Sequence, residues 1–294
     1  MDEFYKITAY ILAGILGLCV GSFLNVVIHR LPRGMRLDRP ASHCPGCGYQ
    51  LRWYDNIPVI SYLILGGRCR SCRTHISFRY TAVELLNTAL WLLSIWAFWD
   101  DSIPFACISA VAASLLLTVA FIDLEHMVVF DRFHVMLGVL GVAAVFTDPE
   151  YGWLSHLIGA GAGFLVFFGV AAFFYYCLHR DALGGGDIKL AAVAGLLLGW
   201  ERLLLAVLIA SFSASLVLPI LARRARGEET PEEGEIPKSG EAEPVDGEEG
   251  SEEETEEEAG PGEFPFCPFL VVGFLVALYF GAPIIEAYLS LFGL

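Results

Sequence analysis

Long apolar stretches alternate with short polar ones along almost the whole chain. The first, residues 7–28, contains no charged residue and is long enough to cross a hydrocarbon core of about 30 Å as a helix. Seven more apolar segments follow, at residues 81–99, 104–122, 133–147, 152–178, 188–200, 202–222 and 268–292. Because only helices and closed barrels span a membrane, this pattern predicts an all-α integral membrane protein with about eight transmembrane helices.

Composition agrees with a membrane protein, since 56% of the 294 residues are hydrophobic and the mean hydropathy is +0.60. The net charge of −15 comes from one segment, residues 228–263, which holds 17 of the 33 acidic residues and one of the 18 basic residues. The other acidic and basic residues nearly cancel. A segment this rich in Glu, Gly and Pro cannot bury enough apolar surface to fold, so we expect a disordered insertion between helices.

The polar loop at residues 29–80 carries nine arginines, half of all basic residues in the chain. Cytoplasmic loops retain Arg and Lys, so this loop is expected to face the cytoplasm. Alternation then places residues 100–101 and 148–150 outside, and residues 123–132, 179–187 and 222–267 inside. The arginines at 223, 224 and 226 favour the same side for the last of these loops.

The arginine-rich loop contains two Cys-x-x-Cys pairs, Cys44 with Cys47 and Cys69 with Cys72. Two residues between cysteines let both thiolates of one turn reach a single ion, and two such turns complete a tetrahedral four-sulfur site. Structural zinc is the favoured interpretation, and a redox dithiol is the alternative. Because four sulfurs leave no open position, such a zinc ion would hold the loop rather than react. We interpret Cys19, Cys107 and Cys177 as small apolar packing residues.

Two aspartates stand at the edges of apolar segments: Asp123 at the end of the third, and Asp187 after three glycines at the start of the sixth. Two membrane crossings separate them, and an even number returns the chain to the same side. Close carboxylates share a proton, so one can take a proton from water while the other donates to a peptide carbonyl. Glycines before Asp187 would allow unusual backbone conformations and close approach of a substrate strand. The pair therefore predicts acid–base peptide hydrolysis.

A simpler interpretation competes with this one, because an Asp at a helix boundary often caps the helix. Asp187 before an apolar run is a plausible N-cap, and Asp131 is a partner or a cap. Nearby Glu125, His134 and Lys189 are interpreted as polar residues at the membrane interface.

Several motifs resemble the bifunctional type IV prepilin peptidases, also called leader peptidase/N-methyltransferases. They are the stretch Gly21 to Pro32, the cysteine loop from Cys44 to Glu84, the piece Trp53 to Leu63, and Gly-x-Gly-Asp at residues 184–187. Asp123 matches the first catalytic aspartate of that family and Asp187 the second. Two positions depart from the family pattern: Phe130 precedes Asp131 where proline is usual, and Cys267 replaces a glycine.

The resemblance implies an aspartic endopeptidase that cuts a short basic leader after a glycine, at the cytoplasmic face of a bacterial inner membrane. Its substrates would be type IV prepilins or pseudopilins of a type II secretion system; no nucleic-acid partner is expected. The resemblance also implies methylation of the new N-terminus with S-adenosylmethionine, associated with the cysteine loop. Asn25 and Glu84 are candidate contributors, or satisfy buried polar groups. The alternatives are a peptidase without methyltransferase activity and a membrane transporter that uses the two carboxylates.

The expected domain organisation follows from these features. Residues 1–28 form the first transmembrane helix, and residues 29–80 form the zinc-binding loop. Residues 81–227 form the membrane aspartic peptidase core, residues 228–263 the acidic insertion, and residues 264–294 the last transmembrane helix.

Overall fold

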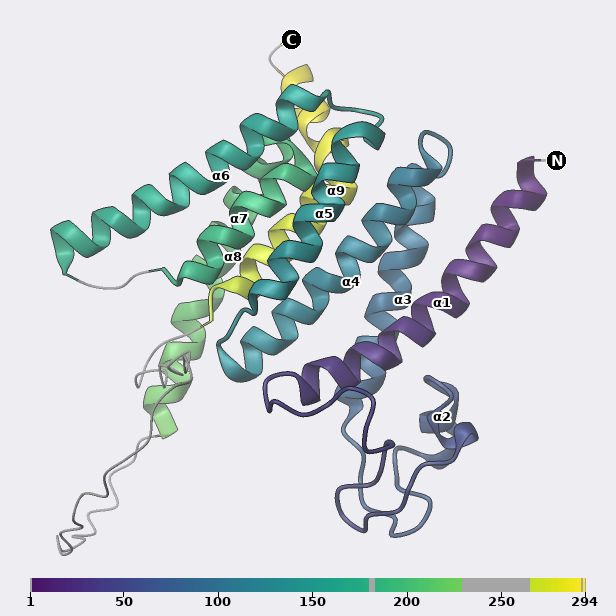
Figure 1. Ribbon diagram of the computed structural model, residues 1–294. Helices are drawn as coiled ribbons and strands as arrows, with labels where there is room; N and C mark the ends of the chain where they lie inside the picture. The colour runs from purple at the N-terminus through teal and green to yellow at the C-terminus, as the bar shows by residue number, and fades with distance from the viewer. Residues whose placement is uncertain (1, 180–182, 229–264, 292, 294) are drawn as a thin grey trace, which may run out of the picture.

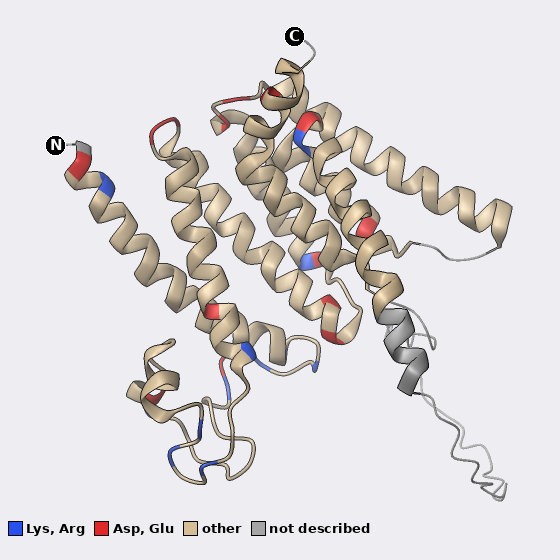
Figure 2. Cartoon of the chain, turned by 180° about the vertical axis from the view of Figure 1, so that it is seen from behind, with Lys and Arg blue, Asp and Glu red and all other residues tan. Residues whose placement is uncertain are grey.

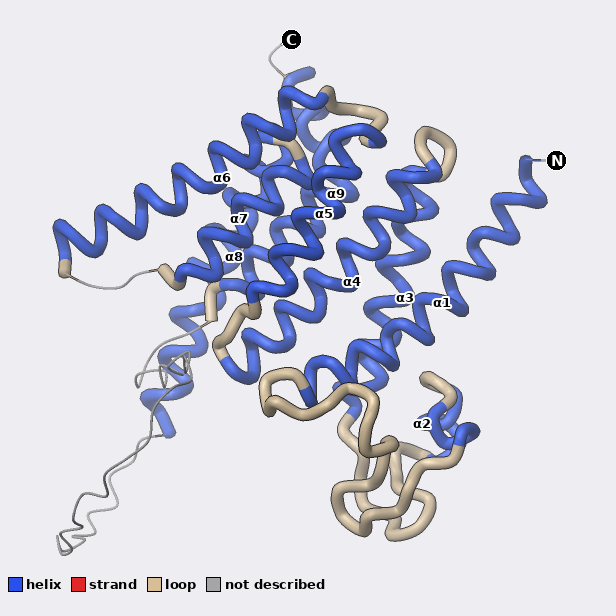
Figure 3. The backbone as a smooth tube through the Cα atoms, viewed as in Figure 1, coloured by secondary structure: helices blue, strands red, loops and turns tan. Residues whose placement is uncertain are grey.

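The computed structural model describes residues 2–179, 183–228, 265–291 and 293, and these residues are helices and loops. Strands are absent from the described ranges, where only isolated bridges occur, His43 with Gln50 and Arg68 with His75 (Figure 3). The long helices are α1 (Asp2–Arg30), α3 (Phe78–Phe98), α4 (Ile103–His126), α5 (Asp131–Thr147), α6 (Trp153–Phe173), α7 (Gly185–Leu198), α8 (Trp200–Glu228) and α9 (Cys267–Ser290). The short ones are η1 (Trp53–Asn56), α2 (Ile60–Leu65) and η2 (Phe174–Leu178), which continues α6.

The long helices run alternately up and down in one bundle (Figure 1). The loop between α1 and α3, the end of α4 and the start of α7 all lie at the lower side in that view. Many of the Lys and Arg residues gather on the same loop, whereas the short loops at the opposite end carry mostly Asp and Glu (Figure 2). The up-and-down course expected from the hydrophobic pattern is therefore seen in the described helices, and the side of the membrane that each end faces stays a prediction.

The predicted number of eight spans needs a correction, because among the described residues six helices are long and apolar enough to cross a membrane. Every predicted apolar segment is helical, but α5 has 17 residues and α7 has 14. At 1.5 Å per residue, α7 is about 21 Å long, less than a hydrocarbon core of about 30 Å. Glycines bound α7 at both ends: Gly184 precedes it, and Gly199 ends it with φ 82°. The break before α8 thus falls at Gly199, not at residues 200–202.

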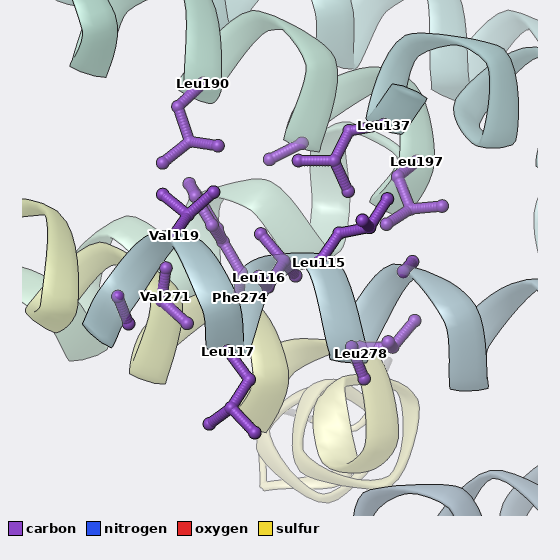
Figure 4. Close-up of a cluster of buried hydrophobic side chains, with 14 of the residues drawn as sticks. Leu115, Leu116, Leu117, Val119, Leu137, Leu190, Leu197, Val271, Phe274 and Leu278 are labelled. Atoms are coloured by element: carbon purple, nitrogen blue, oxygen red, sulfur yellow. The ribbon is translucent and has the colours of Figure 1, made fainter. Parts of the chain in front are cut away.

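Helix α4 is the centre of the bundle, where it contacts α1, α3, α5 and α9. Of its most apolar 18-residue window, 78% is buried. Figure 4 labels the side chains around it: Leu115, Leu116, Leu117 and Val119 of α4, Leu137 of α5, Leu190 and Leu197 of α7, and Val271, Phe274 and Leu278 of α9. This packing carries the end of α4, and Asp123 with it, into the protein interior.

Glycines let several helix pairs approach closely. A Cβ at Gly159 would lie 2.4 Å from the Gly195 carbonyl oxygen, and one at Gly163 would lie 2.4 Å from that of Ala191. Helix α6 therefore meets α7 through glycines spaced four residues apart. Small residues at this spacing are a common way for membrane helices to pack without a hydrophobic driving force.

A buried ionic cluster lies at the end of the bundle opposite the cysteine loop. Arg202 of α8 is 1% exposed, and its guanidinium donates to Asp148 at 2.7 Å and to Glu150 in the loop between α5 and α6. His156 of α6 lies 3.5 Å from the same Asp148 carboxylate. The cluster ties the α5–α6 loop to the start of α8.

The structure also bears on three cysteines and on the acidic segment. The prediction that Cys19, Cys107 and Cys177 are packing residues is wrong, because all three are exposed on the sides of apolar helices. Their helices bury only part of their surface in the bundle, and a small weakly polar thiol is tolerated on the remainder. The acidic segment at residues 228–263 lies outside the described residues, apart from Glu228 at the end of α8.

Candidate active site and cysteine cluster

Asp123 lies in the last turn of α4, where its backbone carbonyl accepts a hydrogen bond from the Met127 N–H at 2.9 Å. Met127 ends the helix in the left-handed conformation, with φ 53°. The Asp123 side chain is 6% exposed, and its Oδ2 is buried without a hydrogen-bond partner among the described residues. Burying a carboxylate oxygen without a hydrogen-bond partner costs free energy, and proteins keep such a group mainly where it has a functional role. The side chain is therefore not a helix cap.

Asp187 is the third residue of α7, not its N-cap. Gly184 occupies the cap position, and no side chain there bonds to the first turn. The Asp187 N–H donates to the Gly184 carbonyl at 3.1 Å, while its partly buried carboxyl group takes no part in capping. The capping alternative is wrong for Asp187, and the carboxyl group remains available for chemistry.

The structure places the two predicted carboxylates within electrostatic reach of each other. Asp187 lies close enough to Asp123 for their charges to interact, and Cys267 at the start of α9 lies within electrostatic reach of both. The Cys267 thiol is 1% exposed, so α9 closes the site with an uncharged side chain. Two carboxyl groups within reach of each other in a largely buried site cannot both carry a full negative charge at low cost, which favours a pair that holds one proton.

The three glycines before Asp187 have a simpler role than the sequence suggested. None of them has a positive φ. A Cβ at Gly186 would come within 3.1 Å of Val129, whereas Gly184 and Gly185 face open space. A side chain at Gly186 would press on Val129, whereas one at Gly184 or Gly185 would meet no atom of the described residues.

The start of α5 contacts both sides of Asp187. Asp131 is the first residue of α5 and accepts a hydrogen bond from Lys189 at 2.7 Å. His134 lies one turn later and contacts the Gly186 carbonyl oxygen at 3.0 Å. Asp131 is thus a partner of Lys189 rather than a cap. Sequence reasoning missed His134 as a site residue, although the Asp131-x-x-His134 spacing places both side chains on one helix face.

The four predicted cysteines form one cluster, and their sulfur atoms all lie within 4.8 Å of one another. The Sγ atoms of Cys44 and Cys72 are 3.8 Å apart, and those of Cys47 and Cys69 are 4.0 Å apart. A tetrahedral zinc site with bonds of about 2.3 Å has sulfurs about 3.8 Å apart. The arrangement therefore fits a four-thiolate metal site.

Both cysteine pairs have the same backbone fold. In each, the residue after the second cysteine is left-handed, Gly48 with φ 69° and Arg73 with φ 60°. Each of these two residues donates its N–H to the carbonyl of the first cysteine, at 2.9 and 3.1 Å. This turn aims both sulfurs of a pair at one point.

The thiols differ in how readily they ionise. Hydrogen bonds from the Thr74 hydroxyl and backbone lower the pKa of the Cys72 thiol to about 6. A hydrogen bond with the Tyr49 backbone lowers the pKa of the Cys47 thiol, but burial and the neighbouring thiols outweigh it and raise this pKa to about 11. Because metals bind thiolates, a cation entering the cluster would displace the remaining protons.

Asp55 joins the two halves of the cysteine loop. Its carboxylate accepts from Arg70 of the second pair at 2.7 Å and from the Tyr49 hydroxyl, next to the first pair, at 3.1 Å. Burial opposes its ionisation, but the Arg70 guanidinium and the Tyr49 hydroxyl outweigh burial and hold the pKa of Asp55 below its usual range. The ionised Asp55 carboxylate therefore links the two cysteine pairs through Arg70 and Tyr49.

One hydrogen bond attaches the loop to α3, and two further contacts join α1, α3 and α4 beside it. The Val59 N–H donates to the Glu84 carboxylate of α3 at 2.8 Å, and Asn25 of α1 donates to the Tyr80 carbonyl at 2.9 Å. Arg79 at the start of α3 forms an ion pair with Glu125, two residues after Asp123. Asn25 and Glu84 thus satisfy backbone groups, the second of the roles expected for them.

Comparisons with known proteins agree with this geometry. Residues 15–98 match the family described as Bacterial Peptidase A24 N-terminal domain, and residues 110–219 match the Type IV leader peptidase family. A Prepilin leader peptidase/N-methyltransferase from Myxococcus xanthus is 40% identical over 79% of this chain and 69% of its own length. Proteins of the same name from Burkholderia pseudomallei and Pseudomonas aeruginosa are each 32% identical, over 92% and 97% of this chain and 84% and 95% of their own lengths. No solved structure is significantly similar to the chain.

Proposed function

The chain belongs to the type IV leader peptidase family, and from this premise we propose that it cleaves the leader peptide of a type IV prepilin or pseudopilin and methylates the new N-terminal amine. The peptidase assignment is supported by the end of α4 and the start of α7, which carry Asp123 and Asp187 at the same end of the bundle, within electrostatic reach of each other. Neither aspartate caps its helix.

The proposed cleavage follows from the shared proton. The ionised carboxylate of the pair takes a proton from a water molecule, whose oxygen attacks the carbonyl carbon of the scissile peptide. The protonated carboxyl group donates its proton to the carbonyl oxygen. The tetrahedral species then collapses: the C–N bond breaks, the proton taken from water passes to the leaving amine, and a hydroxyl proton of the tetrahedral species returns to the second carboxylate. The two acids exchange protonation states during the attack and regain their original states in the collapse, and no covalent intermediate forms.

We propose that this site faces the cytoplasm of a bacterial inner membrane. The cysteine loop with its nine arginines lies at the same end of the bundle as the aspartate pair. Retention of Arg and Lys in the cytoplasm supports this orientation. A short basic leader would then be presented to the site from the side on which the precursor is made.

We propose zinc as the ion held by Cys44, Cys47, Cys69 and Cys72, and S-adenosylmethionine as the methyl donor. The sulfur separations support zinc, which when bound would crosslink the two halves of the loop. The methyl donor is supported by the printed names of the relatives. The hydrogen bond from the Val59 N–H to Glu84 holds the loop beside α3, and the Arg79–Glu125 pair joins the start of α3 to the end of α4. These contacts support a methyl-transfer site next to the peptidase site.

Asp123→Asn and Asp187→Asn, in the full-length protein purified in detergent, test the peptidase assignment. An amide can neither take up nor donate the proton, so each variant should lose about 10²-fold to 10⁴-fold or more in the rate of prepilin cleavage. The measurement is the appearance of mature pilin with time. Exposed Asp101, at the opposite end of the bundle, provides the matched control Asp101→Asn, which should cleave normally.

Cleavage at the normal rate by either pair variant would overturn the assignment. The same preparations decide between the bifunctional enzyme and a peptidase alone. With labelled S-adenosylmethionine and pre-cleaved pilin, Asp123→Asn should still transfer methyl groups. A wild-type protein that cleaves but transfers no label would instead be a peptidase only. Transport carboxylates tend to lie near the bilayer midplane, whereas these lie at the ends of their helices, so no observation favours a transporter.

A further inference from the structure

The first turn of α7 is held by the start of α5 at two points, one on each side of Asp187. His134 contacts the carbonyl oxygen of Gly186, the residue before Asp187, with its Nε2 at 3.0 Å. Because a carbonyl oxygen only accepts, Nε2 must carry the hydrogen. Lys189, two residues after Asp187, donates to Asp131 at 2.7 Å.

The residues of α5 that make these contacts are themselves held in place. His134 is 6% exposed, and its Nδ1 lies 3.4 Å from the Asp131 carboxylate. Val129, just before α5, packs on Gly186 so closely that a Cβ there would lie 3.1 Å away. The short segment 129–134 therefore meets the Gly184–Asp187 turn through packing, a hydrogen bond and an ion pair.

The same segment is joined directly to the other carboxylate. Only eight positions of chain lead from Asp123 to Asp131, and the left-handed corner at Met127 is bonded back to the Asp123 carbonyl. The corner between α4 and α5 is thus bonded to the Asp123 backbone through Met127. The same corner contacts the first turn of α7, which carries Asp187, through the side chains of Asp131 and His134.

We propose that Asp131, His134 and Lys189 form a clamp that positions Asp187 against Asp123. The proposal rests on the proposed function, because it assigns these three as positioning residues of the same peptidase. A displacement of about 1 Å in a catalytic group can cost about 10²-fold in rate. The clamp acts on the backbone that carries Asp187 and leaves the carboxyl group itself free.

The two arms of the clamp should differ in strength. The Asp131 and Lys189 side chains are 65% and 55% exposed, and exposed ion pairs contribute little. The His134 hydrogen bond is largely buried, where a lost donor leaves a carbonyl unsatisfied. We therefore expect His134 to dominate, and Lys189→Met to reduce the rate only a few-fold.

The test compares His134→Gln with His134→Asn in the full-length protein. The Gln amide nitrogen can take the place of Nε2 and donate to the Gly186 carbonyl, whereas the shorter Asn amide cannot reach it. His134→Asn should lower kcat for prepilin cleavage about 10-fold to 100-fold with KM unchanged. His134→Gln should recover most of the wild-type kcat. Methylation of pre-cleaved pilin should match the wild type in both variants. The melting temperature in detergent should fall in His134→Asn, where the Gly186 carbonyl loses its donor, and should be largely restored in His134→Gln.

Wild-type kcat in His134→Asn would overturn the clamp, and so would an equal loss in the Gln and Asn variants, which would indicate a packing role only. Asp123→Asn and Asp187→Asn, run in parallel, separate the two proposals. If both are inactive while His134→Asn is fully active, the clamp alone is wrong. If either still cleaves normally, the aspartate pair itself is wrong.

Discussion

Asp55 illustrates how a single side chain organises the cysteine loop. The loop is too short to bury an apolar core, and two of its four cysteines are exposed. Its internal order depends on the thiols and on the Asp55 carboxylate, which joins Arg70 to Tyr49 across the two cysteine pairs. Because residues that orient ligands matter almost as much as the ligands, Asp55 should control how tightly the cluster holds an ion.

Asp55→Asn should therefore weaken zinc binding about 10-fold to 100-fold. The neutral amide keeps the size of the side chain but loses the ion pair with Arg70. Zinc release to a chromogenic chelator measures the effect. Asp38→Asn is the matched control, because Asp38 is exposed and pairs only with nearby Arg36. Equal release from both variants would contradict the role given to Asp55.

Cys44→Ser, which removes one sulfur, should abolish binding of about one zinc ion per chain, as elemental analysis would measure. The loop would unfold, so methyl transfer should fall more than prepilin cleavage, since the aspartate pair lies on α4 and α7. Equal loss of both activities would mean instead that the loop supports the whole fold. Cys19→Ser, on the exposed side of α1, should leave zinc and both activities unchanged.

At the scale of elements, the position of α7 depends on how closely α6 approaches it. Gly163 meets the backbone of Ala191, one turn after Asp187, with no room for a side chain. The neighbouring Gly161 faces open space on the same helix. Replacing each of these two glycines by alanine therefore separates the effect of helix packing from the effect of helix propensity.

Gly163→Ala should destabilise the protein by about 1–3 kcal/mol, since the methyl group would push α6 and α7 apart. Prepilin cleavage should fall as well, because α7 carries Asp187. Gly161→Ala should be neutral or stabilising by about 0.5–1 kcal/mol, as expected for a helical position without contacts. Thermal unfolding in detergent and initial cleavage rates measure both effects. Equal melting temperatures for the two variants would exclude the close contact.

At the scale of the whole molecule, the two ends of the bundle have different tasks. The end with the aspartate pair contains open space beside Gly184 and Gly185 and a buried carboxylate oxygen without a partner. The opposite end is closed by Arg202, whose guanidinium is neutralised by Asp148 and Glu150 and lies over the Tyr151 ring at 4.6 Å. The buried ionic cluster therefore lies at the end of the bundle away from the aspartate pair.

Arg202→Met should cost about 3–5 kcal/mol, because it leaves the fully buried Asp148 without its cation. Lys6→Met removes an ion pair with Asp100 at the same end, but that pair is partly exposed, so the cost should be about 0–1 kcal/mol. Chemical unfolding in detergent measures the difference. Cleavage per folded molecule should be unchanged in both variants, and a selective loss of activity in Arg202→Met would contradict this separation of tasks.

Much of the architecture was predictable from local pattern. Apolar length predicted every long helix, and the even number of crossings predicted one end for Asp123 and Asp187. The repeated Cys-x-x-Cys spacing predicted the cluster, because a turn of fixed length aims two sulfurs at one point. The span number was less predictable, since the glycines that shorten α7 do not interrupt its hydrophobicity.

The sequence by itself determined the membrane character, the helices, the common end of the two acids and the four-sulfur cluster, since each depends on residues close in the chain or on a count of crossings. Only the tertiary structure decided that Gly184 takes the cap position of α7 and frees Asp187. It also decided that Asp131 and His134 contact the turn around Asp187, and that Arg202 neutralises Asp148. These contacts join residues about 50 positions apart or more, and helix packing, which no local pattern records, sets their distances.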